Sequence, residues 1–270
     1  MLYVRLSRTT EMRIAVVTPY FTEDRSVLHR CIDSVRTQSV PVDHIFVADG
    51  HPQDWIESYA HINHVVLRKS AADSGDTPRS VGFVVAMRND YDIIQFLDVD
   101  NVLFPNHFDV MLGYFRGLPE DRYPDLVVAR RHMLRPDGSI IDVRVERDEA
   151  LKQIDTSCYV LYRTAFSLGL KWSFIPRQFA FVDDRVFYNM VVAAQLRRIE
   201  VAPVKTVGYT CMWASIYLEA GETPPPNARD LGDLYPAARA WWASLPPHRQ
   251  ALIERDLGVP VLSPPPPDTP

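Results

Sequence analysis

The feature that most constrains the fold is a short apolar run that ends in two acidic residues. Residues 93–97 are apolar apart from Gln95, which suits a buried strand of a parallel sheet. Asp98 and Asp100 follow directly, and an ionised carboxylate is costly to bury without a partner. The strand must therefore end here, at an edge of the sheet that is open to water or to a ligand.

The spacing of these two acids favours a metal site. Side chains at positions i and i+2 of an extended segment point to the same side, so Asp98 and Asp100 can face one point across Val99. Two convergent carboxylates are hard oxygen ligands that suit Mg2+ or Mn2+. The same tripeptide, followed by Asn101, also suits an Asp-rich turn that closes a strand. The rest of the chain decides between these interpretations.

Short strands and helices alternate in the first part of the chain. We expect strands at 13–18, 44–48, 64–68 and 93–97, and helices at 26–37, 55–62 and 79–88. This alternation predicts an α/β fold with a mostly parallel, doubly wound sheet flanked by helices. Ligands of such sheets bind beyond the carboxyl ends of the strands. Thr18, Asp49 and residues 98–100 all lie at such ends.

The second half of the chain has a different pattern. We expect strands at 126–130, 140–145 and 155–162, with a hairpin turn at 135–139. An apolar helix is expected at 186–196, with helical patterns again at 231–243 and 249–256. The proline-rich residues 263–270 can form neither a helix nor a sheet ladder, so we expect a disordered tail there.

Bulk properties restrict the class of protein. The chain has 270 residues, of which 47% are hydrophobic, which suits one large domain with an appendage. The formal net charge of -5 argues against a nucleic-acid partner, which would want a basic surface. Cys31, Cys158 and Cys211 are isolated and suit reduced thiols of a cytoplasmic protein. No run approaches the ~18 apolar residues that a transmembrane helix needs.

Several segments of the first half resemble the nucleotide-sugar-binding part of GT-A-fold glycosyltransferases, most closely those of family 2. They are residues 16–20 (VVTPY), the helix-to-strand passage 34–50, residues 75–82 (GDTPRSVG) and residues 96–100 (FLDVD). The last is similar to the D-x-D motif of the family. One position departs from the family pattern, because Ala48 stands where the first of two adjacent acids is common.

The resemblance implies a GT-A, Rossmann-like catalytic domain at 12–222. Its nucleotide-sugar-binding half would be 12–105, and its acceptor-binding half, with a smaller β region, would be 106–222. A helical extension would follow at 227–258. The family uses the opening loop and the acid after the second strand for the nucleoside, and D-x-D for a metal ion on the diphosphate. The residues expected at the donor site are Thr18, Pro19, Tyr20, Asp49, Asp76, Arg79, Asp98, Val99 and Asp100.

An acidic pair, Asp183 and Asp184, stands just before the apolar helix at 186–196. A helix N-terminus favours anions, and one acid could simply cap the helix. In the family a similar pair includes the general base that deprotonates the acceptor. Asp184 matches this role best and Asp183 is the second candidate. Trp172 could stack on the acceptor sugar, although an aromatic residue equally suits a buried packing role.

The sequence thus predicts a metal-dependent, inverting glycosyltransferase with Mn2+ or Mg2+ as cofactor. The donor would be a UDP- or GDP-sugar, and the acceptor a glycan, a lipid-linked molecule or a small molecule. A homodimer is compatible with the sequence. Two alternatives stay open. A nucleotidyltransferase would share the sheet and the paired acids, but the segment TPYFTEDR lacks the expected Gly-rich loop. A non-catalytic nucleotide-sugar-binding relative would not need both acidic motifs.

Overall fold

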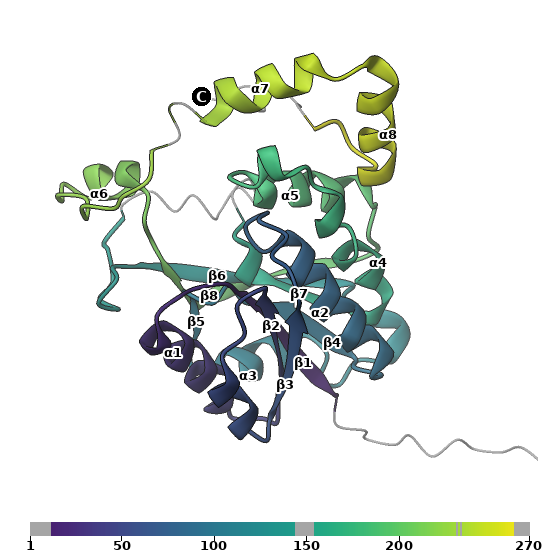
Figure 1. The fold of residues 1–270 in the computed structure, drawn as a ribbon. Coiled ribbons are helices and arrows are strands. Elements are labelled where there is room, and N and C mark those ends of the chain that lie inside the picture. Colours follow the sequence, from purple (N-terminus) through teal and green to yellow (C-terminus); the bar gives the residue numbers. More distant parts are fainter. Residues whose placement is uncertain (1–11, 144–153, 231, 233, 262–270) are drawn as a thin grey trace, which may run out of the picture.

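The structure is a computed structural model that describes residues 12–143, 154–230, 232 and 234–261. One eight-stranded sheet runs through these residues, in the order β3-β2-β1-β4-β7-β6-β8-β5 (Figure 1). The strands are β1 (Ile14–Tyr20), β2 (Asp43–Asp49), β3 (Ile62–Leu67), β4 (Ile93–Phe96), β5 (Val102–Leu103), β6 (Leu126–Leu134), β7 (Tyr159–Tyr162) and β8 (Ile199–Thr210).

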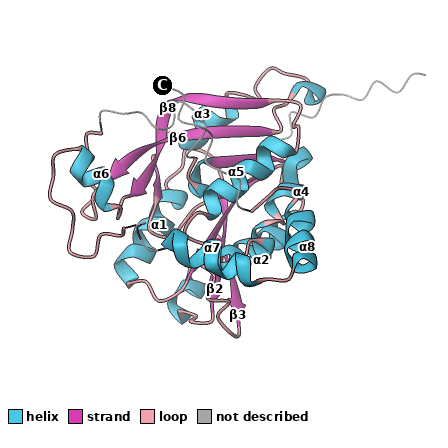
Figure 2. Cartoon of the chain, turned by 90° about the horizontal axis from the view of Figure 1, so that it is seen from above, coloured by secondary structure: helices cyan, strands magenta, loops and turns pink. Residues whose placement is uncertain are grey.

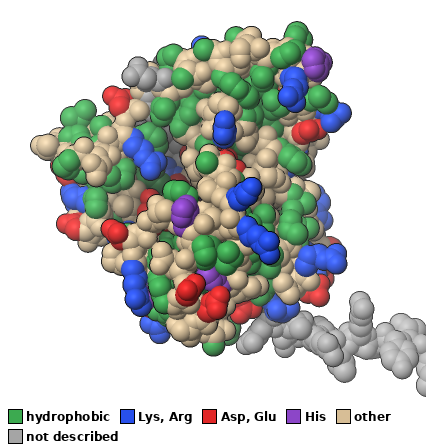
Figure 3. All heavy atoms as spheres, viewed as in Figure 1, with side chains coloured by type: hydrophobic (Ala, Val, Ile, Leu, Met, Phe, Trp, Pro, Cys, Tyr) green, Lys and Arg blue, Asp and Glu red, His purple; other side chains and the backbone are tan. Residues whose placement is uncertain are grey.

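The helices are α1 (Arg25–Arg36), α2 (Asp76–Arg88), α3 (His107–Leu112), α4 (Phe166–Gly169), α5 (Asp183–Ala193), α6 (Ala214–Glu219), α7 (Leu234–Ser244) and α8 (Pro247–Leu257). No helix of the described residues is both long and apolar enough to cross a membrane. Basic and acidic side chains are interspersed over the face of the molecule seen in Figure 3.

The two halves of the chain share the sheet. Strands β3, β2, β1 and β4 pair in parallel, as the sequence predicts for the first half. Strand β7 then pairs antiparallel with β4, from Ile93 opposite Tyr162 to Gln95 opposite Val160. Strands β6, β8 and β5 continue the sheet beyond β7. The strands of the second half of the chain therefore extend the sheet of the first half, and the fold class predicted from the sequence is confirmed.

Helices pack against both faces of the sheet. Gly82 of α2 lies against Val17, Ile45 and Val47, so α2 covers the face to which these side chains point. Helices α1 and α3 lie on the other face, where the Cys31 thiol of α1 is hydrogen-bonded to Thr18 and His107 of α3 to Gln95. Helices α7 and α8 lie at the top of the molecule in Figure 1, and Figure 2, seen from above, shows them on the side of α2.

Strand β1 continues past the point at which the sequence predicts a loop. Pro19 has no backbone N–H, yet it lies within β1 opposite Val47 of β2. The carbonyl of Val17 accepts the last hydrogen bond from the β4 side, from the N–H of Leu97. Pro19 is two residues further on and so faces the same side, where β4 has already ended. No ladder bond is lost, and the strand reaches Tyr20.

Three expected elements differ from the structure. The helix predicted at 55–62 is only a short 3-10 helix, Asp54–Ser58, because Ile62 opens β3 and pairs with His44. The strand predicted at 140–145 is reduced to a single bridge between Ile140 and Leu134, and residues 144–145 lie outside the described residues, as does the tail at 263–270. The strand predicted at 155–162 begins with a 3-10 turn, Thr156–Cys158, capped by Asp155.

Gly82 gives a test of how α2 is seated on the sheet. An added Cβ at Gly82 would lie 2.6 Å from Val17 Cγ1 and 2.8 Å from Val47 Cγ2. We expect Gly82→Val to lower the free energy of unfolding by ~1–3 kcal/mol or more, because both valines are fully buried. Chemical denaturation measures this loss. The control Val84→Ala, on the exposed side of the same helix, should change it by less than ~0.5 kcal/mol. A Gly82→Val protein as stable as its parent would contradict this packing.

Candidate active site

The segment Asp98-Val99-Asp100 forms a fixed turn beyond β4. The N–H of Asn101 donates to the carbonyl of Asp98 at 2.9 Å, and the N–H of Asp98 donates to Ser157 Oγ at 3.2 Å. Arg30 donates to the carbonyl of Asp100 at 2.8 Å. The turn is therefore held by its backbone, which leaves the two carboxylates for other partners. The Asp-rich turn that the sequence also allowed is therefore present.

Arg79 lies under this turn and is almost fully buried. Its Nη1 donates to Asp76 Oδ1 at 2.8 Å, and its Nη2 donates to Asp98 Oδ1 at 2.8 Å. The guanidinium carbon also lies 4.5 Å from the ring centroid of Trp172, within the range of a cation–π interaction. Asp98 thus receives a charge-assisted hydrogen bond from below, while its side chain stays 28% exposed.

The sequence predicts Arg79 at the donor site, whereas the structure turns its guanidinium inward. The side chain is only 2% exposed, and both terminal nitrogens are bonded to carboxylates. Asp76 is fully buried at the first turn of α2, so its side chain cannot reach a donor in the cleft either. Burial raises the pKa of Asp76 to about 7, although the Arg79 charge opposes the shift. Both residues support the D-x-D segment from inside the protein.

Asp98 is paired with Arg79, whereas Asp100 lies near the negative charge of Asp98. Desolvation, together with the nearby Asp98 carboxylate, raises the pKa of Asp100 to about 7, and Arg229 opposes this shift. Two interacting carboxylates at a strand end are a donor set that suits a hard divalent cation. No group of three or more metal-binding side chains occurs among the described residues, so water and substrate oxygens would have to complete the coordination.

The adjacent acids at the start of α5 point to different partners. Asp183 is hydrogen-bonded to the buried Asp76, whereas Asp184 lines a cavity of about 100 Å³. Burial raises the pKa of Asp184, and the charges of Arg131 and Arg185 oppose this shift. The two side chains of the pair therefore diverge. Asp184 is the one that faces the cavity.

The cavity beside Asp184 contains charged and aromatic groups that the sequence did not reveal. Arg131 of β6 and Asp155 lie there, and the Arg131 guanidinium lies 5.1 Å from the ring centroid of Tyr209 of β8. Burial raises the pKa of Asp155 to about 7, against the nearby Arg131 charge. The lining residues are Arg131, Met133, Asp155, Phe181, Val182, Asp184, Arg185, Tyr209, Trp213, Ser215 and Ile216.

The opening loop does not line a cleft with its side chains. Thr18 is fully buried and its hydroxyl is hydrogen-bonded to His44 Nε2 at 2.8 Å, on the α1 side of the sheet. The Tyr20 ring is 2% exposed, and its hydroxyl is hydrogen-bonded to His64 Nε2 at 2.8 Å. Pro19 is also buried. The side chains of Thr18 and Tyr20 are therefore bonded inside the protein, and the contact of this loop with a donor stays a prediction.

Asp49 lies at the end of β2 and organises the loop that leads to α2. Its carboxylate accepts from Ser70 Oγ at 2.9 Å and from the N–H of Ala71 at 2.8 Å. The side chain is 5% exposed. Asp49 therefore holds the backbone near the carboxyl edge of the sheet, and its contact with a nucleoside stays a prediction.

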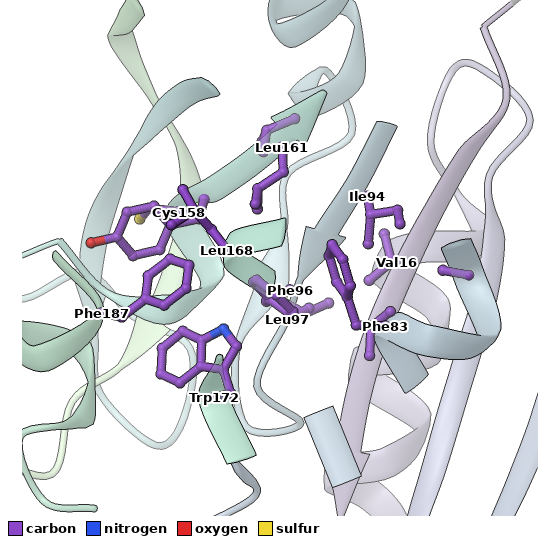
Figure 4. Close-up of a cluster of buried hydrophobic side chains, with 14 of the residues drawn as sticks. Val16, Phe83, Ile94, Phe96, Leu97, Cys158, Leu161, Leu168, Trp172 and Phe187 are labelled. Carbon is purple, nitrogen blue, oxygen red and sulfur yellow. The ribbon is translucent and has the colours of Figure 1, made fainter. Parts of the chain in front are cut away.

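Trp172 belongs to the core, which corrects its predicted role at the acceptor. The side chain is fully buried and stacks on Phe187 of α5 with ring centroids 4.3 Å apart and planes 11° from parallel. Its edge contact with Phe96 of β4 completes the cluster seen in Figure 4. No face of this ring is open to a sugar. Trp213, by contrast, is partly exposed and lines the cavity beside Asp184.

The eight-stranded sheet and its flanking helices match a GT-A-like fold. The structure of S. aureus TarS residues 1–349 matches this chain with a TM-score of 0.56 at 14% identity, covering 91% of this chain and 70% of that chain. The complex of the same fragment with UDP-GlcNAc gives a TM-score of 0.53 at 13% identity, with the same coverage. A longer TarS structure gives a TM-score of 0.54 at 13% identity, covering 77% of this chain.

This chain spans only 38% of that longer TarS chain. At such low identity the likeness shows a shared fold. No family model and no curated protein matches the sequence.

Substitution of Trp172 and of Trp213 tests whether the first ring belongs to the core and the second to the cavity wall. We expect Trp172→Ala to lower the free energy of unfolding by ~3–5 kcal/mol, the usual loss for a fully buried large aromatic residue. The matched control Trp213→Ala removes a partly exposed ring and should cost clearly less. Chemical denaturation of both variants measures the two losses. If Trp172→Ala keeps the stability of the parent, the ring is not part of the core.

Proposed function

We propose that the protein transfers a sugar from a nucleoside diphosphate sugar to an acceptor hydroxyl. The observation that carries this proposal is the placement of two acidic groups on one GT-A sheet. The D-x-D carboxylates lie beyond β4, and Asp184 of α5 lies close enough for the Asp98 charge to raise its pKa. Complexes of TarS with UDP and with UDP-GlcNAc support a uridine nucleotide as the donor class.

Asp98 and Asp100 would hold a Mn2+ or Mg2+ ion against the donor diphosphate. The bound ion would act as a Lewis acid that stabilises the charge on the leaving diphosphate. Arg79 keeps Asp98 in place through its ion pair, and the backbone bonds of the turn keep the two carboxylates together. The exposed part of Asp98 is the part that is left for the ion.

Asp184 is the general base of the proposed reaction. Its carboxylate takes the proton of the acceptor hydroxyl while the acceptor oxygen forms a bond to the anomeric carbon. The bond from that carbon to the diphosphate oxygen breaks, and the nucleoside diphosphate leaves with the electron pair. The attack comes from the side opposite the leaving group, so the anomeric configuration inverts. The raised pKa of Asp184 makes it a better proton acceptor than an exposed aspartate.

The metal requirement can be tested before the acceptor is known. A hydrolysis screen of nucleotide sugars with Mn2+ should identify a UDP-sugar that the parent protein cleaves slowly. Asp100→Ala should abolish this cleavage. The control Asp256→Ala removes an exposed carboxylate that is paired with Arg255, and it should leave the cleavage unchanged. Full activity after treatment with EDTA would show that no ion is needed.

Metal binding should also depend on pH. The pKa of Asp100 is raised to about 7, so below that pH a cation must displace a proton from this carboxyl. We expect the apparent Mn2+ affinity to fall up to about tenfold per pH unit below pH 7 and to level off above it. Calorimetry measures the affinity. An affinity that stays constant down to about pH 5 would place the ion away from Asp100.

The general base is tested by Asp184→Asn. This change keeps the size and hydrogen-bonding capacity of the side chain but removes its basicity. We expect sugar transfer to fall ~100-fold or more, the usual scale of general-base catalysis, with little change in donor affinity. The anomeric configuration of the product is read by NMR. Normal transfer by Asp184→Asn, or a product that retains the donor configuration, would contradict the inverting mechanism.

A further inference from the structure

Asp183 is the acid of the α5 pair that does not line the cavity, and its neighbours indicate a structural role. It is hydrogen-bonded to Asp76, which is fully buried at the start of α2. Asp76 Oδ1 accepts from Arg79, while no N–H or hydroxyl group of the described residues reaches the buried Asp76 Oδ2. A hydrogen bond between two carboxyl groups requires a proton on one of them.

The charges around this contact also call for a proton. Asp76 is influenced by Asp73, Asp98 and Asp183, and the only cation among its main electrostatic partners is Arg79. Asp183 is influenced by Asp76, Asp98 and Asp184, again with Arg79 as the only cation among its main partners. One guanidinium cannot balance these carboxylates in a buried setting, where unpaired charge is costly.

We propose that Asp183 is a protonated positioning residue that donates its hydrogen bond to Asp76, which in turn holds Arg79 on Asp98. The proposal rests on the proposed function only in assigning Asp98 to the metal and Asp184 to the acceptor. The proton belongs mainly to Asp183, because Asp76 already has the guanidinium as a partner. Burial, with the Asp76 charge, raises the pKa of Asp183 well above its usual range.

This chain of contacts joins the two acidic motifs through the core. It runs from α5 through Asp183, Asp76 and Arg79 to Asp98 beyond β4. A second link runs in parallel, because Phe187 of α5 stacks on Trp172, which lies against the same guanidinium. A neutral Asp183 also removes one negative charge beside Asp184, which leaves Asp184 free to ionise as the base.

The proton can be detected without substrate. Asp183 and Asp76 bind a proton more tightly in the folded protein than in the unfolded chain. The parent should therefore lose stability as pH rises from about 5 to 9. Asp183→Asn supplies a neutral hydrogen-bond donor at every pH, so its melting temperature should fall less over this range. The infrared absorption of protonated carboxyl groups at neutral pH should also weaken in Asp183→Asn.

Asp125→Asn is the matched control, because the pKa of Asp125 is shifted in the opposite direction to that of Asp183. Asp125 is buried too, but hydrogen bonds from Thr164 and Arg197 hold its pKa below the usual range. Its ionised form stabilises the fold above the pKa of the unfolded chain. Asp125 is ionised in both the folded and the unfolded protein from about pH 5 to 9, so the melting temperature of Asp125→Asn should lie below that of the parent by the same amount across this range. The gap should close only below about pH 5. If Asp183→Asn does not fold, Asp76→Asn replaces the other carboxyl group of the contact. Its melting temperature is then measured over the same pH range.

Positioning is tested by Mn2+ titration without donor. Asp183→Ala breaks the contact with Asp76 and should weaken Mn2+ binding about tenfold, while Asp183→Asn should restore most of it. Parallel melting curves for parent and Asp183→Asn, an unchanged infrared absorption, or equal Mn2+ affinities of Asp183→Ala and parent would overturn the proposal. None of these measurements uses a sugar nucleotide. A protein that passes them but cleaves no donor would contradict the proposed function alone.

Discussion

The structure depends on the buried ion pairs of one arginine. Arg79 joins Asp76 at the start of α2 to Asp98 at the end of β4, and it lies over the ring of Trp172. An arginine with a 2% exposed side chain is stable only when its charge is paired and its plane is packed, and here both conditions are met. Removing either acid would leave one buried N–H group of the guanidinium without its acceptor. The contact therefore fixes the orientation of the D-x-D segment from within the core.

The sheet brings the remaining groups to the same edge. Strand β7 pairs antiparallel with β4, so Asp155 and Ser157, just before β7, meet the turn that follows β4. Helix α5 then places Asp184 beside Arg131 of β6. Groups from both halves of the chain thus meet at the edge of one continuous sheet, which explains why their charges influence one another.

The sequence predicted the parts of this fold that depend on local pattern. The β-branched runs of β1, β2 and β4 and the helical spacing in α1 and α2 are short-range signals, and all five elements form. The role of Trp172 could not be predicted locally, because an aromatic residue beside polar ones suits a core and a sugar site equally. Arg131 and Asp155 were missed because they meet Asp184 only through long-range pairing of β6 and β7. The one sequence signal for Arg131 was its position as a charged residue within the run that forms β6, which would have marked it as a candidate site residue.

The most direct test of the account is a crystal of the protein soaked with Mn2+ and UDP, examined by anomalous diffraction. The account predicts one strong manganese peak bound by the carboxylates of Asp98 and Asp100, with the UDP diphosphate on the same ion. It also predicts that Arg79 stays on Asp98 beneath the site. A manganese peak at other residues, or UDP bound away from the carboxyl edge of β4, would contradict the account.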